Sequence, residues 1–245
     1  GSGPGPDPAA ALSPEALARV RDEAHLLRDD TDALCDLLFS ATTSTGTVAL
    51  VLDNAGPELL HDLALADALL AAGACAQVEL HCKDAPVFVS DVVEADVGET
   101  LAWLDTQGGG AEELARDVRA RIAEGSIFLE SSEKFYTSPE PFWRMPEGLR
   151  KRFARADVVL LKGDANYRRW LGDLHWAHDA PLEDAVGGGE WECPVAAIRT
   201  CKSEVLCGVA RARTEAAAEA RPADWLTAGQ YGMVQLYVPD FDEEA

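Results

Sequence analysis

A short, uninterrupted apolar run at residues 47–52 (Thr-Val-Ala-Leu-Val-Leu) constrains the fold of this chain more than any other segment. It is rich in branched residues and carries no charge, which is typical of a strand covered on both faces in a parallel sheet. The run ends at Asp53-Asn54-Ala55-Gly56-Pro57, and an apolar helical pattern follows over residues 58–72. The segment therefore predicts a strand, a turn and a helix, which is the repeating unit of α/β proteins.

The rest of the chain repeats this alternation. Residues 76–82, 127–129, 157–161, 195–198 and 233–238 are predicted strands, and residues 85–91 are a short extended segment. Helical patterns cover residues 14–39 (after Ser13 as N-cap), 58–72, 99–105, 111–123, 146–155 and 166–171, while residues 202–209 fit a helix or a turn. This order predicts an α/β fold with a mainly parallel, Rossmann-like central sheet.

The chain of 245 residues is long enough to bury one large core. We expect a single domain over residues 13–239, between a disordered tail at residues 1–12 and an acidic tail at residues 240–245. No apolar run approaches the ~20 residues of a membrane helix. The start of the chain lacks the basic and apolar regions of a secretory signal. We therefore expect no membrane association.

Charge and cysteine content narrow the function further. The formal net charge is −22, which argues against a nucleic-acid partner because phosphate backbones demand clustered Lys and Arg. The six cysteines include no C-x-x-C pair and resemble neither a disulfide framework nor a zinc cage. A reducing compartment, the cytoplasm or also the nucleus, fits best. Nothing in the sequence identifies a protein partner.

Polar residues stand where several predicted strands end. They are Asp53-Asn54, Lys162-Gly163-Asp164, Arg199-Thr200 and, after the extended segment, Ser90-Asp91. Ligands of open α/β sheets bind beyond the carboxyl ends of the strands, so these positions are informative. Carboxylate and amide oxygens suit Mg²⁺ or Mn²⁺. Taken alone, Asp53 and Asn54 fit a helix cap about as well as a metal site.

Lys202 follows a predicted strand and is expected to open a helical turn. There its ammonium and the free backbone N–H groups could hold a phosphate together. A metal ion with Lys and Arg nearby neutralises phosphoryl oxygens and stabilises the charge of the transition state. Without its neighbours, Lys202 would be interpreted as a surface lysine.

Several motifs occur together in a characteristic order. They are Asp53-Asn54-Ala55-Gly56-x-Glu58-Leu59, Phe88-Val89-Ser90-Asp91, Leu161-Lys162-Gly163-Asp164-x-Asn166-Tyr167-Arg168, Gly172-Asp173 with Trp176, Arg199-Thr200-Cys201-Lys202, and Gly229-x-Tyr231-Gly232-x-Val234-Gln235. Over residues 47–238 the chain resembles the damage-control phosphatase family, in its sugar-phosphate branch with the R-T-x-K signature. Members of this branch are also known as acidic-residue, or protein-glutamate, methyltransferases.

The resemblance implies a three-layer α/β/α sandwich and a metal-dependent phosphatase. Its implied metal ligands are Asp53, Asn54 and Asp91, for Mn²⁺, Mg²⁺, Co²⁺ or Ni²⁺. The implied substrate-binding residues are Asp53, Asn54, Asp164, Asn166, Tyr167, Arg168, Arg199 and Lys202. The implied substrates are small sugar phosphates such as fructose 1-phosphate and fructose 6-phosphate, and the implied role is metabolite damage control.

As a working hypothesis, Asp53, Asp164 and Lys202 are catalytic. Lys202 neutralises a phosphoryl oxygen, and Asp164 binds a sugar hydroxyl or assists proton transfer. The nucleophile is a water molecule or Asp53 itself. An S-adenosylmethionine-dependent protein carboxyl methyltransferase is a weaker alternative, because no G-x-G loop follows the first strand.

Family members usually carry a helical domain before the strand that leads to Asp53. The resemblance therefore implies that most of this domain is missing from the residues ahead of Thr47. A third hypothesis is therefore that the chain is a non-catalytic homologue that only binds metal and sugar phosphate.

Overall fold

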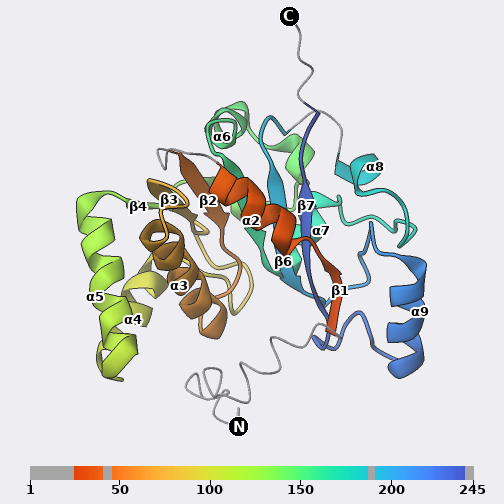
Figure 1. The fold of residues 1–245 in the computed structure, drawn as a ribbon, viewed down its shortest axis with the longest axis horizontal. Helices are drawn as coiled ribbons and strands as arrows, with labels where there is room; N and C mark the ends of the chain where they lie inside the picture. The colour runs from red at the N-terminus through yellow and green to blue at the C-terminus, as the bar shows by residue number, and fades with distance from the viewer. Residues whose placement is uncertain (1–24, 41–45, 187–190, 241–245) are drawn as a thin grey trace, which may run out of the picture.

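A seven-stranded sheet runs through the residues that the computed structural model describes, which are 25–40, 46–186 and 191–240 (Figure 1). The strands follow the order β1-β7-β6-β5-β2-β3-β4. Their bounds are β1 Leu26–Asp29, β2 Thr47–Val51, β3 Gln77–His81, β4 Ile127–Glu130, β5 Val158–Lys162, β6 Val195–Thr200 and β7 Gly232–Tyr237. Only β6 and β7 pair antiparallel within these residues, so the predicted α/β fold with a mainly parallel sheet is confirmed.

Helices cover both faces of this sheet. They are α2 Thr31–Ser40, α3 Pro57–Ala71, α4 Glu94–Asp105, α5 Gly109–Glu124, α6 Glu147–Phe153, α7 Gly163–Trp170, α8 Leu182–Val186 and α9 Arg211–Ala220. Two 3₁₀ helices, η3 Lys134–Thr137 and η4 Phe142–Arg144, lie between β4 and α6. In Figure 1, α2 and α3 cross in front of the strands.

Side-chain alternation along β2 explains the three layers. Val48 and Leu50 point into a core shared with α3, α4 and α5, while Ala49 and Val51 point into a second core shared with α6 and α7. All four side chains are buried. A strand without a solvent-facing side must lie inside the sheet with a helical layer on either face, and β2 does lie between β5 and β3. The expected α/β/α sandwich is therefore confirmed.

The N-terminal segment corrects one prediction. Residues 14–39 were expected to form a helix, but residues 26–29 form β1, which pairs with β7 at the edge of the sheet. In the described part of this segment the helix is α2, which begins at Thr31, whose backbone N–H donates to Asp29 Oδ1. Residues 14–24 of the predicted helix lie outside the described residues. Burial of Leu27 and the hydrogen bond from Asp30 N to Val234 O compensate for the lost helical turns. This partner strand lies some two hundred residues away, so the local pattern could not reveal it.

Other segments also differ from the sequence prediction: α8 and α9 were not predicted, and α4 begins at Glu94 rather than at residue 99. Residues 202–209 contain neither a helix nor a strand, and residues 85–91 form a loop whose Asp91 makes an isolated bridge to Asn54. The proposed tail at residues 1–12, the helix start at Ser13 and residues 241–245 of the acidic tail lie outside the described residues. All six cysteines are free thiols, and all but Cys35 are buried.

Within the described ranges, the longest apolar helices are still too short or too polar to cross a bilayer.

Replacing Leu27 tests the strand assignment at the N-terminus. Because its side chain is 4% exposed, Leu27→Ala should lower the free energy of unfolding by about 2 kcal/mol. Phe39→Ala, in the same region but 52% exposed, should change it by no more than about 0.5 kcal/mol. Urea unfolding of both variants measures the difference, and equal small effects would contradict the packing of β1.

Candidate functional site

The carboxylate of Asp53 lies at the carboxyl end of β2, packed against the first turn of α7. The residue is 3% exposed. A Cβ atom on Gly163 would come within 2.1 Å of Asp53 Oδ2, and Gly163 has a φ of +80°. Only glycine combines this backbone conformation with such a close approach. The glycine of the Lys162-Gly163-Asp164 motif is therefore required by its close contact with Asp53, which follows the neighbouring strand β2.

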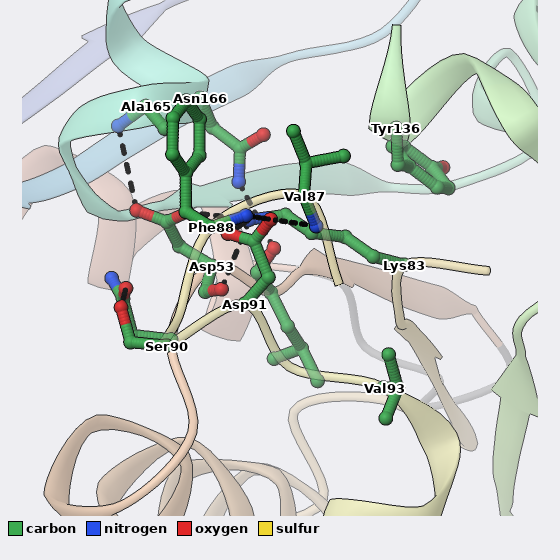
Figure 2. Close-up of polar contacts among 12 residues, drawn as sticks. Asp53, Lys83, Val87, Phe88, Ser90, Asp91, Val93, Tyr136, Ala165 and Asn166 are labelled. Atoms are coloured by element: carbon green, nitrogen blue, oxygen red, sulfur yellow. Dashed lines mark hydrogen bonds and ion pairs between the residues drawn. The ribbon is translucent and has the colours of Figure 1, made fainter. Parts of the chain in front are cut away.

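Lys83 joins Asp53 to Asp91. Its ammonium Nζ lies 2.9 Å from Asp53 Oδ1, 2.6 Å from Asp91 Oδ1 and 3.1 Å from the Asp53 carbonyl oxygen. The side chain of Lys83 is 6% exposed, and those of both aspartates are 4% exposed. Figure 2 shows both carboxylates directed at the end of the lysine side chain. Two carboxylates from separate segments thus converge on one buried cation.

Lys83 was not among the site residues predicted from the sequence, although its position carries a signal. The residue follows the predicted strand at residues 76–82, so it stands at the same edge of the sheet as Asp53. Applying the carboxyl-end rule to that strand would have placed a cation beside the two carboxylates.

The loop that carries Asp91 is fixed by backbone hydrogen bonds. Asp91 Oδ2 accepts from the N–H groups of Val87 (2.9 Å) and Phe88 (2.8 Å), and Val92 N donates to Asp53 O. Burial alone would raise the pKa of Asp91, but the hydrogen bonds from Lys83 and from the backbone of Phe88 hold this pKa below its usual value. Asp91 is therefore ionised at neutral pH.

Asn54 lies beside this cation without touching it. Its Oδ1 accepts from Ser90 Oγ at 2.7 Å, and its Nδ2 donates to Glu58 Oε2 at 3.0 Å. The N-cap of α3 is Gly56, with no side-chain cap hydrogen bond, so neither Asp53 nor Asn54 caps this helix. The interpretation of Asp53-Asn54 as a mere helix cap is thus wrong.

Glu58, which accepts the hydrogen bond from Asn54, is itself perturbed. Burial and the charges of Asp53 and Asp62 raise the pKa of Glu58.

Asp164, Arg199 and Lys202 form a second cluster. Arg199 is buried and pairs with Asp164 Oδ1 at 2.7 Å, and the backbone N–H of Lys202 donates to the same oxygen at 3.0 Å. The expected helical turn at Lys202 is absent, and its N–H group is already engaged. The side chain of Lys202 is exposed, so only its ammonium is available to an anion.

Tyr167 and Asn166 are buried residues that contact the two clusters and the strands beside them. Tyr167 is fully buried under the Arg199 guanidinium, 4.1 Å from ring to cation, and its hydroxyl donates to Gln235 Oε1. Asn166 Nδ2 donates to Val51 O (3.3 Å), Leu52 O (3.1 Å) and Lys162 O (2.8 Å). Asn166 therefore ties the carboxyl end of β2 to that of β5.

A cavity of about 310 Å³ adjoins the Lys83 cluster. Of the sequence-predicted residues, Asp91, Asn166 and Arg168 line it, together with Lys83, Phe88 and Arg169. Arg168 forms a two-point ion pair with Asp173, and burial lowers the pKa of Arg169 to about 10. The other predicted site residues do not line this cavity: Asp53, Asn54, Asp164, Tyr167, Arg199 and Lys202. The predicted site thus consists of two clusters connected through the first turns of α7.

A larger cavity of about 470 Å³ lies at the amino ends of β2 and β3, lined by Thr47, Gln77 and Arg152 among others. It contains none of the predicted site residues. Cavity size alone therefore does not select the candidate site, which is defined by the buried charged side chains around Lys83.

The residues around Lys83 fit a hard divalent cation. In the described part of the chain, no three His, Cys, Asp or Glu side chains gather as a metal site, so the donor set beside Lys83 is two aspartates with one amide. Two carboxylates and a neighbouring amide are oxygen ligands of the kind that Mg²⁺ and Mn²⁺ take, usually with several waters. The Lys83 ammonium marks the point where their charges converge on a cation.

Substituting Gly163 tests the packing of Asp53. Gly163→Ala should lower the free energy of unfolding by about 2 kcal/mol or more, because the new methyl group meets the Asp53 carboxylate in a strained backbone. Gly125→Ala is the matched control, since Gly125 has nearly the same φ, +81°, and nothing within 4 Å of an added Cβ atom. Thermal unfolding should show the larger loss for Gly163→Ala, and equal losses would contradict the close approach.

Comparison with known proteins gives a consistent result. The sequence profile of a family described as "Damage-control phosphatase ARMT1-like domain" matches residues 10–217. Proteins named Damage-control phosphatase ARMT1 are 33% identical in Mus musculus, over 87% of this chain and 50% of that protein, and 30% identical in Danio rerio, over 96% of this chain and 54% of that protein. The chain thus spans about half the length of the curated relatives it matches.

A solved structure of a DUF89 family protein from Pyrococcus horikoshii aligns with a TM-score of 0.48 and 16% identity, covering 85% of this chain and 57% of that one. This likeness is too low to carry an argument.

Proposed function

The chain belongs to the damage-control phosphatase family of ARMT1-like domains, and from this premise we propose that it hydrolyses small sugar phosphates with the help of a divalent metal ion. The observation that carries the proposal is the convergence of Asp53 and Asp91 on one buried cation at the carboxyl end of the central strand. In open α/β sheets, this edge is where ligands bind.

Asp53, Asn54 and Asp91 would hold the metal. Mn²⁺ and Mg²⁺ suit this donor set best, and Co²⁺ or Ni²⁺ are further candidates. When bound, a divalent ion supplies charge that neutralises phosphoryl oxygens. Asn54 would contribute its amide oxygen, which now accepts a single hydrogen bond from Ser90.

The adjoining cavity supports a small substrate. Its volume of about 310 Å³ is at the lower end of the range for ligand pockets, which suits a sugar phosphate rather than a nucleotide or a peptide. Arg168, Arg169 and Lys83 supply positive charge along its wall in a protein whose net charge is −22. Phe88 and Tyr136 supply apolar surface for the sugar carbons. Fructose 1-phosphate and fructose 6-phosphate are the substrates we propose.

The second cluster would handle charge and protons. Lys202 carries an exposed ammonium that can neutralise a phosphoryl oxygen. Asp164 is held in place by Arg199 and by the backbone N–H of Lys202, so its carboxylate has a fixed position from which to accept a proton or to bind a sugar hydroxyl. Because these side chains lie outside the cavity lining, we propose that the substrate bridges the two clusters.

The surroundings of Asp53 favour water as the nucleophile. Its Oδ1 contacts Lys83, and its Oδ2 packs against Gly163 and accepts from Ala165 N at 3.4 Å. A carboxylate engaged on both oxygens and almost fully buried is poorly placed for in-line attack on a phosphorus atom. We therefore assign Asp53 to metal binding and orientation rather than to covalent catalysis.

Asp53→Asn is the direct test of the proposed function. It keeps the side-chain shape and removes the charge, so turnover of fructose 1-phosphate with Mn²⁺ should fall at least ~100-fold. Asp105→Asn, an exposed aspartate on α4 paired with Arg119, is the matched control and should keep full activity. Unchanged turnover in Asp53→Asn would contradict the assignment.

The wild-type protein in the same assay separates the remaining alternatives. Binding of Mn²⁺ and sugar phosphate without turnover would support the hypothesis of a non-catalytic homologue. Heat of binding with S-adenosylmethionine in calorimetry would support the methyltransferase hypothesis instead.

A further inference from the structure

Lys83 is the least expected residue of the site. Lysine is almost never fully buried unless its charge is paired, and here the ammonium is enclosed by two carboxylates and a carbonyl oxygen. Its backbone is fixed as well, since Lys83 N donates to Val92 O at 3.0 Å and the residue bridges to Val93. Only the four-carbon side chain is therefore able to change position.

The oxygens that Lys83 contacts are the ones a metal ion would need. Asp91 Oδ2 already accepts two backbone N–H groups, and Asp53 Oδ2 lies against Gly163. The Oδ1 atoms of Asp53 and Asp91 remain, and both contact the Lys83 ammonium. A divalent ion and an ammonium would compete for these two oxygens, because like charges at a separation of ~4 Å repel each other in a buried site.

We propose that Lys83 is a resident counter-cation: its ammonium fills the metal position in the metal-free protein, and the metal displaces it into the adjoining cavity. This inference rests on the proposed function, because it requires a metal at Asp53 and Asp91. Without the metal, the Lys83 ammonium offsets one of the two carboxylate charges and joins the loop of Asp91 to the end of β2. Metal binding thus exchanges one cation for another at an assembled site.

The displaced ammonium of Lys83 can move into the adjoining cavity. Lys83 lines it together with Arg168 and Arg169, so a rotation about the lysine side-chain bonds brings the ammonium into the same space. The released charge would lie where a phosphoryl group approaches the metal. Metal binding would therefore also raise the positive charge of the substrate pocket.

Calorimetric titration of the full chain with MnCl₂ tests the competition. Lys83→Met removes the competing charge, so it should bind Mn²⁺ at least about tenfold more tightly than the wild type. Lys162→Met is the matched control: Lys162 makes the same kind of buried ion pair, with Asp62 Oδ1 at 3.0 Å, and loses the same charge and volume. It should bind Mn²⁺ with nearly wild-type affinity.

The outcomes separate this inference from the proposed function. If the wild type binds Mn²⁺ and Lys83→Met binds it equally or more weakly, the counter-cation role is overturned while the metal site stands. If neither the wild type nor Lys83→Met binds Mn²⁺, the metal site fails and the counter-cation role fails with it. Equal tightening in Lys162→Met would show a general charge effect and would also overturn the specific role of Lys83.

A second measurement needs no variant and so does not depend on folding of Lys83→Met. Wild-type protein is labelled with an amine-reactive ester with and without Mn²⁺, and the modification of each lysine is read by mass spectrometry. Labelling of Lys83 should rise severalfold with Mn²⁺ as its ammonium enters the cavity, while that of Lys162 stays constant. Labelling of Lys83 that is unchanged or reduced by Mn²⁺ would overturn the displacement.

Discussion

The burial of β2 on both faces is the constraint on which the rest of the structure depends. Because Val48 and Leu50 belong to one core and Ala49 and Val51 to the other, the strand has to lie between helical layers and between neighbouring strands. Parallel pairing with β3 and β5 then brings the carboxyl ends of all three strands to one edge. Asp53, Lys83 and the start of α7 meet at this edge as a direct result.

Buried charges at this edge of the sheet are stabilised by opposite charges close by. Breaking a buried ion pair by removing one partner typically costs about 3–5 kcal/mol, because the remaining charge has lost its hydration. The Asp164–Arg199 pair balances its two charges, whereas in the Asp53–Lys83–Asp91 cluster one ammonium faces two carboxylates and offsets one of the two negative charges. Asn166 adds three hydrogen bonds to backbone carbonyls between them. Ion pairs and backbone hydrogen bonds within the protein thus position most of the polar side chains at this edge.

Residues of one family motif differ in their positions in the site. Arg199 and Tyr167 of the R-T-x-K and N-Y-R segments are buried and position Asp164, whereas Arg168 reaches the cavity and the Lys202 side chain is exposed. Neighbouring residues of a motif are therefore buried or exposed independently of one another, because successive side chains of a helix or strand point in different directions. A motif marks where a site is built, and only the side-chain directions separate the supporting residues from those that meet a ligand.

The sequence by itself determined the strands at residues 47–52 and 157–161, the polar residues that follow them, and the α/β architecture. These features depend on short-range periodicity, which is visible without knowing any partner. Only the tertiary structure decided that residues 26–29 form a strand, since their partner β7 lies far along the chain. It also decided that Lys83 joins Asp53 to Asp91, that Asn166 binds backbone, and that Lys202 opens no helix. Each of these depends on which distant groups satisfy a buried charge or hydrogen bond, and local pattern carries no information about that choice.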